Sequence, residues 1–304
     1  MRAQQSTRTA TLRGIVAIVL WAGLATLTTL ARPVPPFQLA AMTFAIAAVL
    51  GLLLGWRQGV RLAELQRVPI RAWVLGIYGL LGFHACYFFS LSAAPAVEAN
   101  LINYTWPLLI VVMSGLLPAS LGGGRLRWWH LAGALLGFAG TVLLLGAGER
   151  AQLSGSFAGY AAAFASAFIW SSYSVASRLF PGVPNHAVTG YCAGTALGAL
   201  GLHLALETTV WPAVATAWLA IVAAGVGPVG LAFFLWDDGV KHGHIRVLGV
   251  ASYATPLLST LLLNFTGQGQ ATASVWLAAV AISAGALVAS RELLVGPNKK
   301  RTPS

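Results

Sequence analysis

Residues 95–107 read PAVEANLINYTWP, and they carry polar and aromatic side chains inside a segment apolar enough to cross a bilayer. On a continuous helix, four of them would share one face, because their spacing is i, i+3, i+4 and i+7: Asn100, Asn103, Tyr104 and Pro107. Polar groups cost several kcal/mol in hydrocarbon unless a partner satisfies them. The pattern therefore predicts that this face lines a solute pathway and does not face lipid.

The composition is that of an integral membrane protein. Of the 304 residues, 58% are hydrophobic and 8% are charged, and the mean hydropathy is +0.78. A soluble domain carries about 25% charged residues. Apolar runs of roughly 20 residues recur, which favours membrane helices over the short alternating segments of a membrane barrel. We therefore predict an all-α polytopic membrane protein that contacts the lipid bilayer.

Ten transmembrane helices are expected from the apolar runs. Their predicted ranges are 14–31, 37–56, 72–93, 95–118, 128–147, 156–179, 186–206, 213–238, 245–266 and 273–294. The basic start and apolar run of residues 1–31 also suggest a cleaved signal peptide. No clean small-x-small cleavage site follows that run, so we interpret it as the first span.

The basic residues predict the orientation of the chain. Sixteen of the 18 Lys and Arg residues fall on one side of the expected spans, and only Arg32 and Arg150 fall on the other. By the positive-inside rule, both termini are expected in the cytoplasm. This asymmetry also explains the net charge of +11 without nucleic-acid binding.

The chain repeats itself at a spacing of about 149 residues. The repeated pairs include Trp21 with Trp170, Tyr87 with Trp236, Tyr104 with Tyr253, and Pro107 with Pro256. Each half, 1–150 and 151–304, would hold five spans, and an odd number inverts the second half relative to the first. Two inverted five-helix repeats around a central cavity are a device of transporters that alternate access between the two sides.

Aromatic and polar residues near the centres of these spans are the candidate solute contacts. They are Trp21, His84, Tyr87, Asn100, Asn103, Tyr104, Trp106, Trp170, Tyr173, Ser174, Ser252 and Tyr253. The rings would form a box for a planar, partly apolar solute, and the Asn and Ser side chains would supply hydrogen bonds. Each candidate has a structural alternative. Trp21 and Trp170 could serve only in packing, and His84 could be a structural group whose hydrogen bonds are satisfied. The serines could bond their own backbone.

Hinge and coupling residues are also expected. Pro107 and Pro256 would bend each half at matching depth, and Gly227 with Pro228 would loosen the eighth span. Glu98, as an acidic residue inside a span, and His84 are candidates for coupling to protons, while Glu98 could instead bind a solute ammonium or be solvated in an outer vestibule. Asp237 and Asp238 end the eighth span near Lys241, where a local ion pair is expected.

We expect neither a cofactor nor a metal. Cys86 and Cys192 fall inside predicted spans, and the run from Lys241 to His244 has no cysteine or acidic ligand beside it. An intramembrane enzyme would need an HExxH motif or paired Asp residues in facing spans, and neither pattern is present.

Taken together, these residues resemble the drug/metabolite transporter superfamily in its ten-span form with two EamA-type repeats. The resemblance rests on LSAAPAVEANL at 91–101, YTWPLL at 104–109, its echo YATPLL at 253–258, and Trp21. Within the superfamily, one set of residues is similar to that of bacterial inner-membrane aromatic amino acid exporters: Trp21, His84, Tyr104, Trp106 and Trp170.

This resemblance implies export of phenylalanine, tyrosine and tryptophan, with other amino acids and flat cationic toxicants as further solutes. No charged residue is expected at the bilayer centre, which favours facilitated efflux down the solute gradient. The alternatives are exporters of organic cations or of small amino acids, a nucleotide-sugar carrier, an enzyme, and a non-transporting sensor. A monomer is expected.

Overall fold

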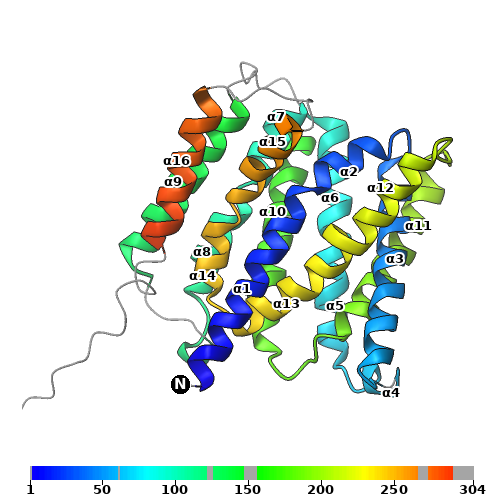
Figure 1. The fold of residues 1–304 in the computed structure, drawn as a ribbon, viewed down its shortest axis with the longest axis horizontal. Coiled ribbons are helices and arrows are strands. Elements are labelled where there is room, and N and C mark those ends of the chain that lie inside the picture. The colour runs from blue at the N-terminus through cyan, green and yellow to red at the C-terminus, as the bar shows by residue number, and fades with distance from the viewer. Residues whose placement is uncertain (1, 61, 122–125, 147–155, 266–272, 290–304) are drawn as a thin grey trace, which may run out of the picture.

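The computed structural model describes residues 2–60, 62–121, 126–146, 156–265 and 273–289. All regular elements in these ranges are helices (Figure 1). Several of the basic residues used to predict orientation lie outside the described ranges: Arg61, Arg125, Arg150, Arg291, Lys299, Lys300 and Arg301.

The first half begins with two helices that meet at Gly23 and ends with a long apolar helix. In chain order the elements are α1 (Arg2–Ala22), α2 (Leu24–Leu30), α3 (Pro36–Arg57), α4 (Leu62–Leu65), α5 (Ile70–Ile77), the π-helical segment η1 (Tyr78–Gly82), α6 (Phe83–Ala93), α7 (Ala96–Asn103), α8 (Trp106–Ser114), the short 3₁₀ turn η2 (Ala119–Leu121) and α9 (Trp128–Gly146).

The second half follows the same sequence of long and divided helices. Its elements are α10 (Phe157–Ala176), the 3₁₀ turn η3 (Ser177–Leu179), α11 (Ala187–Leu206), α12 (Ala215–Val226), the π-helical segment η4 (Gly227–Leu231), α13 (Ala232–His242), α14 (Ile245–Ala251), α15 (Ala254–Phe265) and α16 (Ala273–Ala289).

Each predicted span coincides with a helix or with a string of consecutive helices, and the main error is at the N-terminus. The first helix was expected from residue 14, but α1 begins at Arg2. The apolar run marks only the part suited to lipid, and the polar residues before it contain no proline or glycine that would end a helix. Elsewhere local signals define the starts: Pro36 opens α3, and the Ser156 side chain caps α10 by accepting from Gly159 N.

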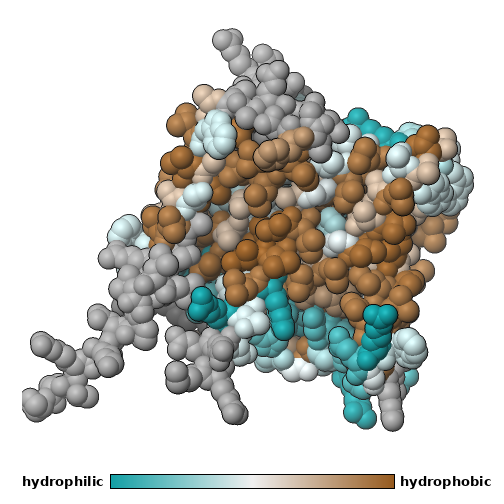
Figure 2. Space-filling view, in the orientation of Figure 1, coloured by the Kyte–Doolittle hydropathy of each residue, from teal (hydrophilic) through white to brown (hydrophobic). Residues whose placement is uncertain are grey.

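Several helical stretches have the length and apolarity needed to cross a membrane. Among the described residues they are Ser6–Leu30, Pro36–Arg57, Ile70–Ala93, Ala187–Leu206 and Ala215–His242, with Trp128–Leu143 and Val275–Ala289 as shorter apolar helices. Figure 2 shows a broad hydrophobic belt across one face, with hydrophilic side chains gathered at the edge that holds the start of α1 and α4. The exposed apolar surface therefore suits a lipid environment.

The two halves share unusual backbone features at the same spacing as the sequence repeat. The π-helical segments start at Tyr78 and Gly227, which are 149 residues apart. The helix pairs α7/α8 and α14/α15 are both interrupted, after Asn103 and after Ala251. In each pair the interruption comes just before a proline. The proline accounts for it, because proline lacks an N–H and its ring clashes with the preceding turn.

The interruption at residues 104–105 corrects the expectation that Asn100, Asn103, Tyr104 and Pro107 form one continuous helical face. Helix α7 ends at Asn103, and α8 starts afresh at Trp106. The proline ring at position 107 would crowd the carbonyl of Asn103, four residues earlier, so the chain cannot continue as a regular helix. Asn100 and Asn103 therefore lie on α7, while Pro107 lies on α8.

The helices that carry the interruptions lie in the middle of the molecule. In Figure 1, α9 and α16 pack together along one edge, α3, α11 and α12 lie at the other, and α1, α8, α10, α13 and α14 lie between them. Helix α14 approaches α8 closely at Gly249, where an added Cβ would lie 3.2 Å from the carbonyl oxygen of Pro107. The main hydrophobic core fills the space around α1, α10 and α13.

Candidate solute-binding site

A group of seven aromatic side chains lies at the centre of the molecule around Trp170, and we name it the aromatic cluster. Its members are Trp21, Phe83, Trp106, Trp170, Tyr173, Phe233 and Trp236. The Trp170 ring stacks on Trp236 with centroids 6.0 Å apart and meets Trp21 edge-on at 5.6 Å. Such offset and edge-to-face pairs each contribute about 0.5–1.5 kcal/mol beyond the area they bury.

Hydrogen bonds between helices fix several of these rings. Trp21 Nε1 donates to the carbonyl oxygen of Pro228, in the π-helical segment η4, at 3.0 Å. Trp236 Nε1 donates to Ser174 Oγ at 3.1 Å. These two hydrogen bonds join α1 to η4 and α13 to α10 within the cluster.

Trp106 reaches the cluster because α8 starts next to α10. Its carbonyl oxygen accepts a hydrogen bond from Ser171 Oγ at 2.9 Å, and its ring meets Trp170 edge-on at 6.4 Å. Helix α10 therefore bonds the backbone at the start of α8 and also carries Trp170, the ring that Trp106 contacts.

His84 lies beside the cluster among aromatic rings. Its Nδ1 is 2.7 Å from the carbonyl oxygen of Leu80, one turn earlier, and its ring meets Phe44 at 5.0 Å and Phe83 at 5.1 Å, both nearly perpendicular. One turn further along α6, the Tyr87 hydroxyl donates to Asn100 Oδ1. Helices α6 and α7 are thus joined by a polar contact next to the histidine.

The other polar residues of α7 contact α10 instead. Asn103 Oδ1 accepts from Ser166 Oγ at 3.0 Å, and Glu98 accepts a hydrogen bond from the Tyr160 hydroxyl. Glu98 is 6% exposed, so this carboxylate is buried. Tyr104 follows the last residue of α7 and lies in the interruption before α8.

Two expected contacts do not join this group. The Ser252 hydroxyl donates to Leu248 O, one turn back in its own chain. The Tyr253 ring is buried between α9, α15 and α16, where it packs on Phe138, Leu257 and Ile282. The repeat partner of Tyr104 therefore lies outside the aromatic cluster.

Three members of the cluster were not among the predicted contacts: Phe83, Phe233 and Trp236. A signal for Trp236 was present, since it is the repeat partner of Tyr87, which was predicted. Phe83 precedes His84, but nothing in its spacing separates it from the other phenylalanines of apolar helices.

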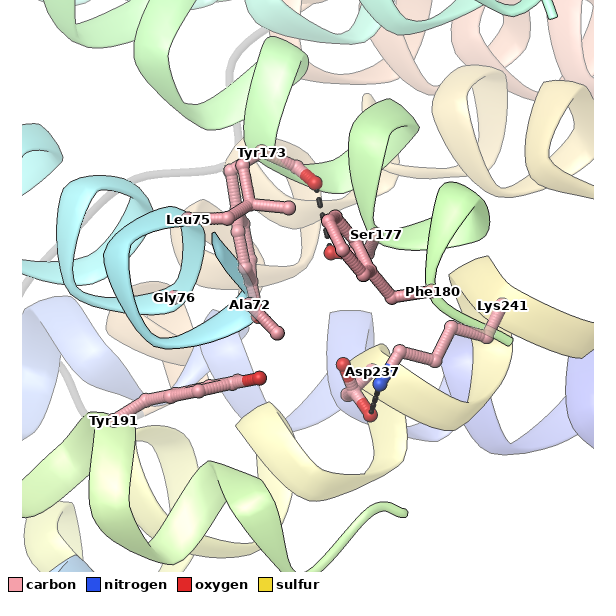
Figure 3. Close-up of a pocket in the computed structure, with 9 residues that line it drawn as sticks. All are labelled: Ala72, Leu75, Gly76, Tyr173, Ser177, Phe180, Tyr191, Asp237 and Lys241. Carbon is pink, nitrogen blue, oxygen red and sulfur yellow. Dashed lines mark hydrogen bonds and ion pairs between the residues drawn. The ribbon is translucent and has the colours of Figure 1, made fainter. Parts of the chain in front are cut away.

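A small polar cavity lies next to the cluster, between α5, α10, η3, α11 and α13 (Figure 3). Tyr173 borders both. At its far side the Asp237 carboxylate pairs with Lys241 Nζ at 2.8 Å, which confirms the expected local ion pair. Arg178 crosses the same end of the molecule and donates to the carbonyl oxygens of Leu121, Val240 and Gly243.

Comparison with known families identifies the class of protein. The model of the EamA-like transporter family matches the chain twice, over residues 9–146 and 157–291. The chain belongs to the EamA-like transporter family. It is therefore a multi-pass membrane transporter, and the superfamily resemblance inferred from the sequence is confirmed.

Sequence matches to curated relatives cover nearly the whole chain. The aromatic amino acid exporter YddG of Ancylobacter novellus is 49% identical, and the match covers 94% of this chain and 98% of that protein. The aromatic amino acid exporter YddG of Salmonella typhimurium is 30% identical, with 92% and 96% covered. A solved crystal structure that is 48% identical has a TM-score of 0.88, and the match covers 94% of this chain and 97% of that chain.

Proposed function

We propose that this EamA-like transporter exports aromatic amino acids across the bacterial inner membrane. The observation that carries the proposal is the aromatic cluster around Trp170, built from five stretches of helix and held by indole hydrogen bonds. Planar side chains bind well between such rings. The relatives named as aromatic amino acid exporters, one of them 49% identical, support the same substrate class.

The architecture we propose has ten membrane spans, arranged as inverted repeats 1–150 and 151–304 around a central cavity, with both termini in the cytoplasm. It is supported by the two matches of the family model and by the shared spacing of the π-helical segments and helix interruptions. Inversion follows from five spans in each half, and alternate exchange of the two conformations opens the centre to each side in turn.

Within this architecture, the solute ring lies against Trp21, His84, Trp106 and Trp170, all of which touch the aromatic cluster or belong to it. Polar groups for the solute come from α6, from α7 and from the residue after it: Tyr87, Asn100, Asn103 and Tyr104. Helix α10 adds Tyr173 and Ser174. Ser252 and Tyr253 act in helix packing in this proposal, because their contacts lie elsewhere.

The hinges of alternation are the interruptions before Pro107 and Pro256 and the π-helical segment that contains Gly227 and Pro228. These places have fewer regular backbone hydrogen bonds, so a change of angle costs less there than within an unbroken helix. Efflux is facilitated in this proposal, with the solute gradient as the driving force. Glu98 and His84 are the coupling residues if a proton gradient is used.

The function is tested with the purified full chain in liposomes loaded with labelled phenylalanine. We expect efflux well above that of empty liposomes, competition by tyrosine and tryptophan, and no change when a proton gradient is applied or collapsed. Loss of this efflux in Trp106→Ala and in His84→Ala would place both residues on the pathway. Absence of efflux from wild-type vesicles would refute the proposal.

Export of flat organic cations is the second candidate, because indole faces attract cations. It is separated from amino acid export by growth of cells that express the chain. Protection against toxic aromatic amino acid analogues, without protection against toxic cations, is the expected result.

A further inference from the structure

The polar cavity next to the aromatic cluster carries charged groups that the proposed ring contacts do not use. Its volume is about 10 Å³, which is room for one water molecule. Figure 3 shows Tyr173, Tyr191 and Phe180 around it, with Asp237 and Lys241 on the side of α13. The ring of Tyr173 also contacts Trp170, with centroids 5.4 Å apart, so the cavity adjoins the cluster directly.

The ion pair in this cavity is deeply buried. The side chains of Lys241 and Asp237 are 3% and 1% exposed, and the carbonyl oxygen of Val183 is 3.3 Å from Lys241 Nζ. Within the described part of the chain, Asp237 Oδ1 has no hydrogen-bond partner, although Oδ2 bonds Lys241. Burying a carboxylate oxygen without a hydrogen-bond donor costs free energy, so Asp237 Oδ1 is suited to accept a hydrogen bond from a ligand.

The pair is electrically neutral, and this limits what it can bind. A ligand with one charge would leave either Asp237 or Lys241 buried and unpaired, which is strongly unfavourable. A zwitterion brings both charges, so that its ammonium can pair with Asp237 and its carboxylate with Lys241. Every charge then keeps a partner when the original ion pair opens.

We propose that Asp237 and Lys241 form a recognition site for the zwitterionic head group of an amino acid, adjacent to the aromatic cluster. The inference rests on the proposed function and adds a reason why the solute is an amino acid and not a flat cation. Tyr173 and Tyr191 flank the head group in this site, and the solute ring extends past Tyr173 to the aromatic cluster. Helices α5 and α11 move away from α13 to admit the solute.

The test measures how a cation and an anion compete with phenylalanine. Liposomes containing the full chain are loaded with labelled phenylalanine and with either benzyltrimethylammonium or 3-phenylpropionate, and the inhibition constant of each competitor is measured. Asp237→Asn leaves Lys241 unpaired, so we expect inhibition by the anion to strengthen about tenfold, the effect of one gained charge contact. Lys241→Met leaves Asp237 unpaired, and inhibition by the cation should strengthen similarly.

The matched control is Asp238→Asn, the same change one residue away. Asp238 pairs with Arg13 and His242 outside the cavity, so its variant should keep both wild-type inhibition constants. The charge swap of Asp237→Lys with Lys241→Asp restores a neutral pair and should also return both constants to the wild-type range. Inhibition constants do not depend on how much protein is active, so reduced folding of a variant does not obscure them.

A purely structural ion pair gives a different result. Phenylalanine efflux would fall in both single variants while both inhibition constants stayed within about twofold of wild type, and this would overturn the inference. Absent phenylalanine efflux in the wild type would instead refute the proposed function, so the two failures are distinguishable.

Discussion

Helix pairs α7/α8 and α14/α15 have the same backbone plan and different surroundings. Both are interrupted just before a proline, and the two prolines, Pro107 and Pro256, are 149 residues apart. At the first interruption, Trp106 contacts Trp170 of the aromatic cluster, and Asn103 bonds Ser166. At the second, Tyr253 packs on Phe138 toward α9 and α16.

This difference separates two properties that the repeat combines in the sequence. The backbone break follows from proline alone, because the missing N–H and the ring clash act wherever the residue lies in a helix. The contacts of the neighbouring aromatic residue depend on which helix packs beside it. Equal spacing therefore supports a shared bend in both halves, while the side chains contact the aromatic cluster in one half and pack on α9 and α16 in the other.

The largest expected effect comes from replacing the ring at the centre of the cluster. Trp170→Ala should reduce phenylalanine efflux at least tenfold and lower the free energy of unfolding by about 3–5 kcal/mol, because Trp170 is 4% exposed and contacts the other rings. Tyr253→Ala should destabilise by a similar amount, since its ring is fully buried. Efflux by reconstituted protein and thermal unfolding in detergent measure the two properties.

The comparison fails if Tyr253→Ala changes the relative efflux of phenylalanine, tyrosine and tryptophan as strongly as Trp170→Ala. Trp170→Phe is the control, since it keeps an aromatic ring in the cluster and should retain most of the efflux.

A smaller effect is expected from glycines that touch the two tyrosines. A Cβ added at Gly79 would overlap Tyr173 and lie 2.7 Å from its Cβ, and one added at Gly137 would lie 3.0 Å from Tyr253 Cγ. Each alanine variant should lose about 1–3 kcal/mol in unfolding free energy through overpacking. Only Gly79→Ala should also change the KM for phenylalanine, because Tyr173 contacts Trp170. Equal KM values in both variants would contradict the assignment of Tyr173 to the site.

These comparisons also show what sequence reasoning can reach. Apolar runs located the helices, since burial in lipid requires about 20 apolar residues per crossing. Pro107 and Pro256 indicated where the helices bend. The bend before Pro107 also means that residues 95–107 do not form the single helical face that was predicted. Asn100 and Asn103 lie on the same helix, α7, and contact α6 and α10 respectively, whereas Trp106 belongs to the next helix, α8.

Residues whose role depends on a neighbour were harder to predict. Trp236 belongs to the cluster because α13 lies against α1 and α10, and its spacing within α13 does not reveal this. No proline in the sequence indicates the π-helical segment η1 at Tyr78, whereas Gly227 and Pro228 indicated a loosened helix at η4, between α12 and α13. Composition gives local backbone features, and tertiary packing decides which aromatic residues meet.

A further prediction concerns the buried carboxylate of α7. Glu98→Gln keeps an oxygen that can accept from Tyr160, but it removes the charge from that hydrogen bond. Hydrogen bonds to charged groups contribute about 1.5–3 kcal/mol, so we expect a loss of about 1–2 kcal/mol in unfolding free energy. Phenylalanine efflux should remain independent of the proton gradient in both proteins. A gradient-dependent wild type that becomes independent in Glu98→Gln would instead make Glu98 a coupling residue.

The smallest expected difference lies between two serines near the interruptions. The Ser171 hydroxyl is shared between the carbonyl oxygen of Trp106 in another helix, at 2.9 Å, and that of Ala167 one turn back, at 2.7 Å. The Ser252 hydroxyl bonds Leu248, also one turn back, and reaches no other helix. Removing a hydroxyl that joins two helices should cost about 1 kcal/mol, and removing one that bonds its own turn should cost less, because the Leu248 carbonyl also accepts from the Ser252 N–H. Ser171→Ala should therefore lower the melting temperature more than Ser252→Ala. If the order is reversed, the second interruption depends on its side chain as much as the first, and the contrast between the halves would have to be confined to the aromatic residues.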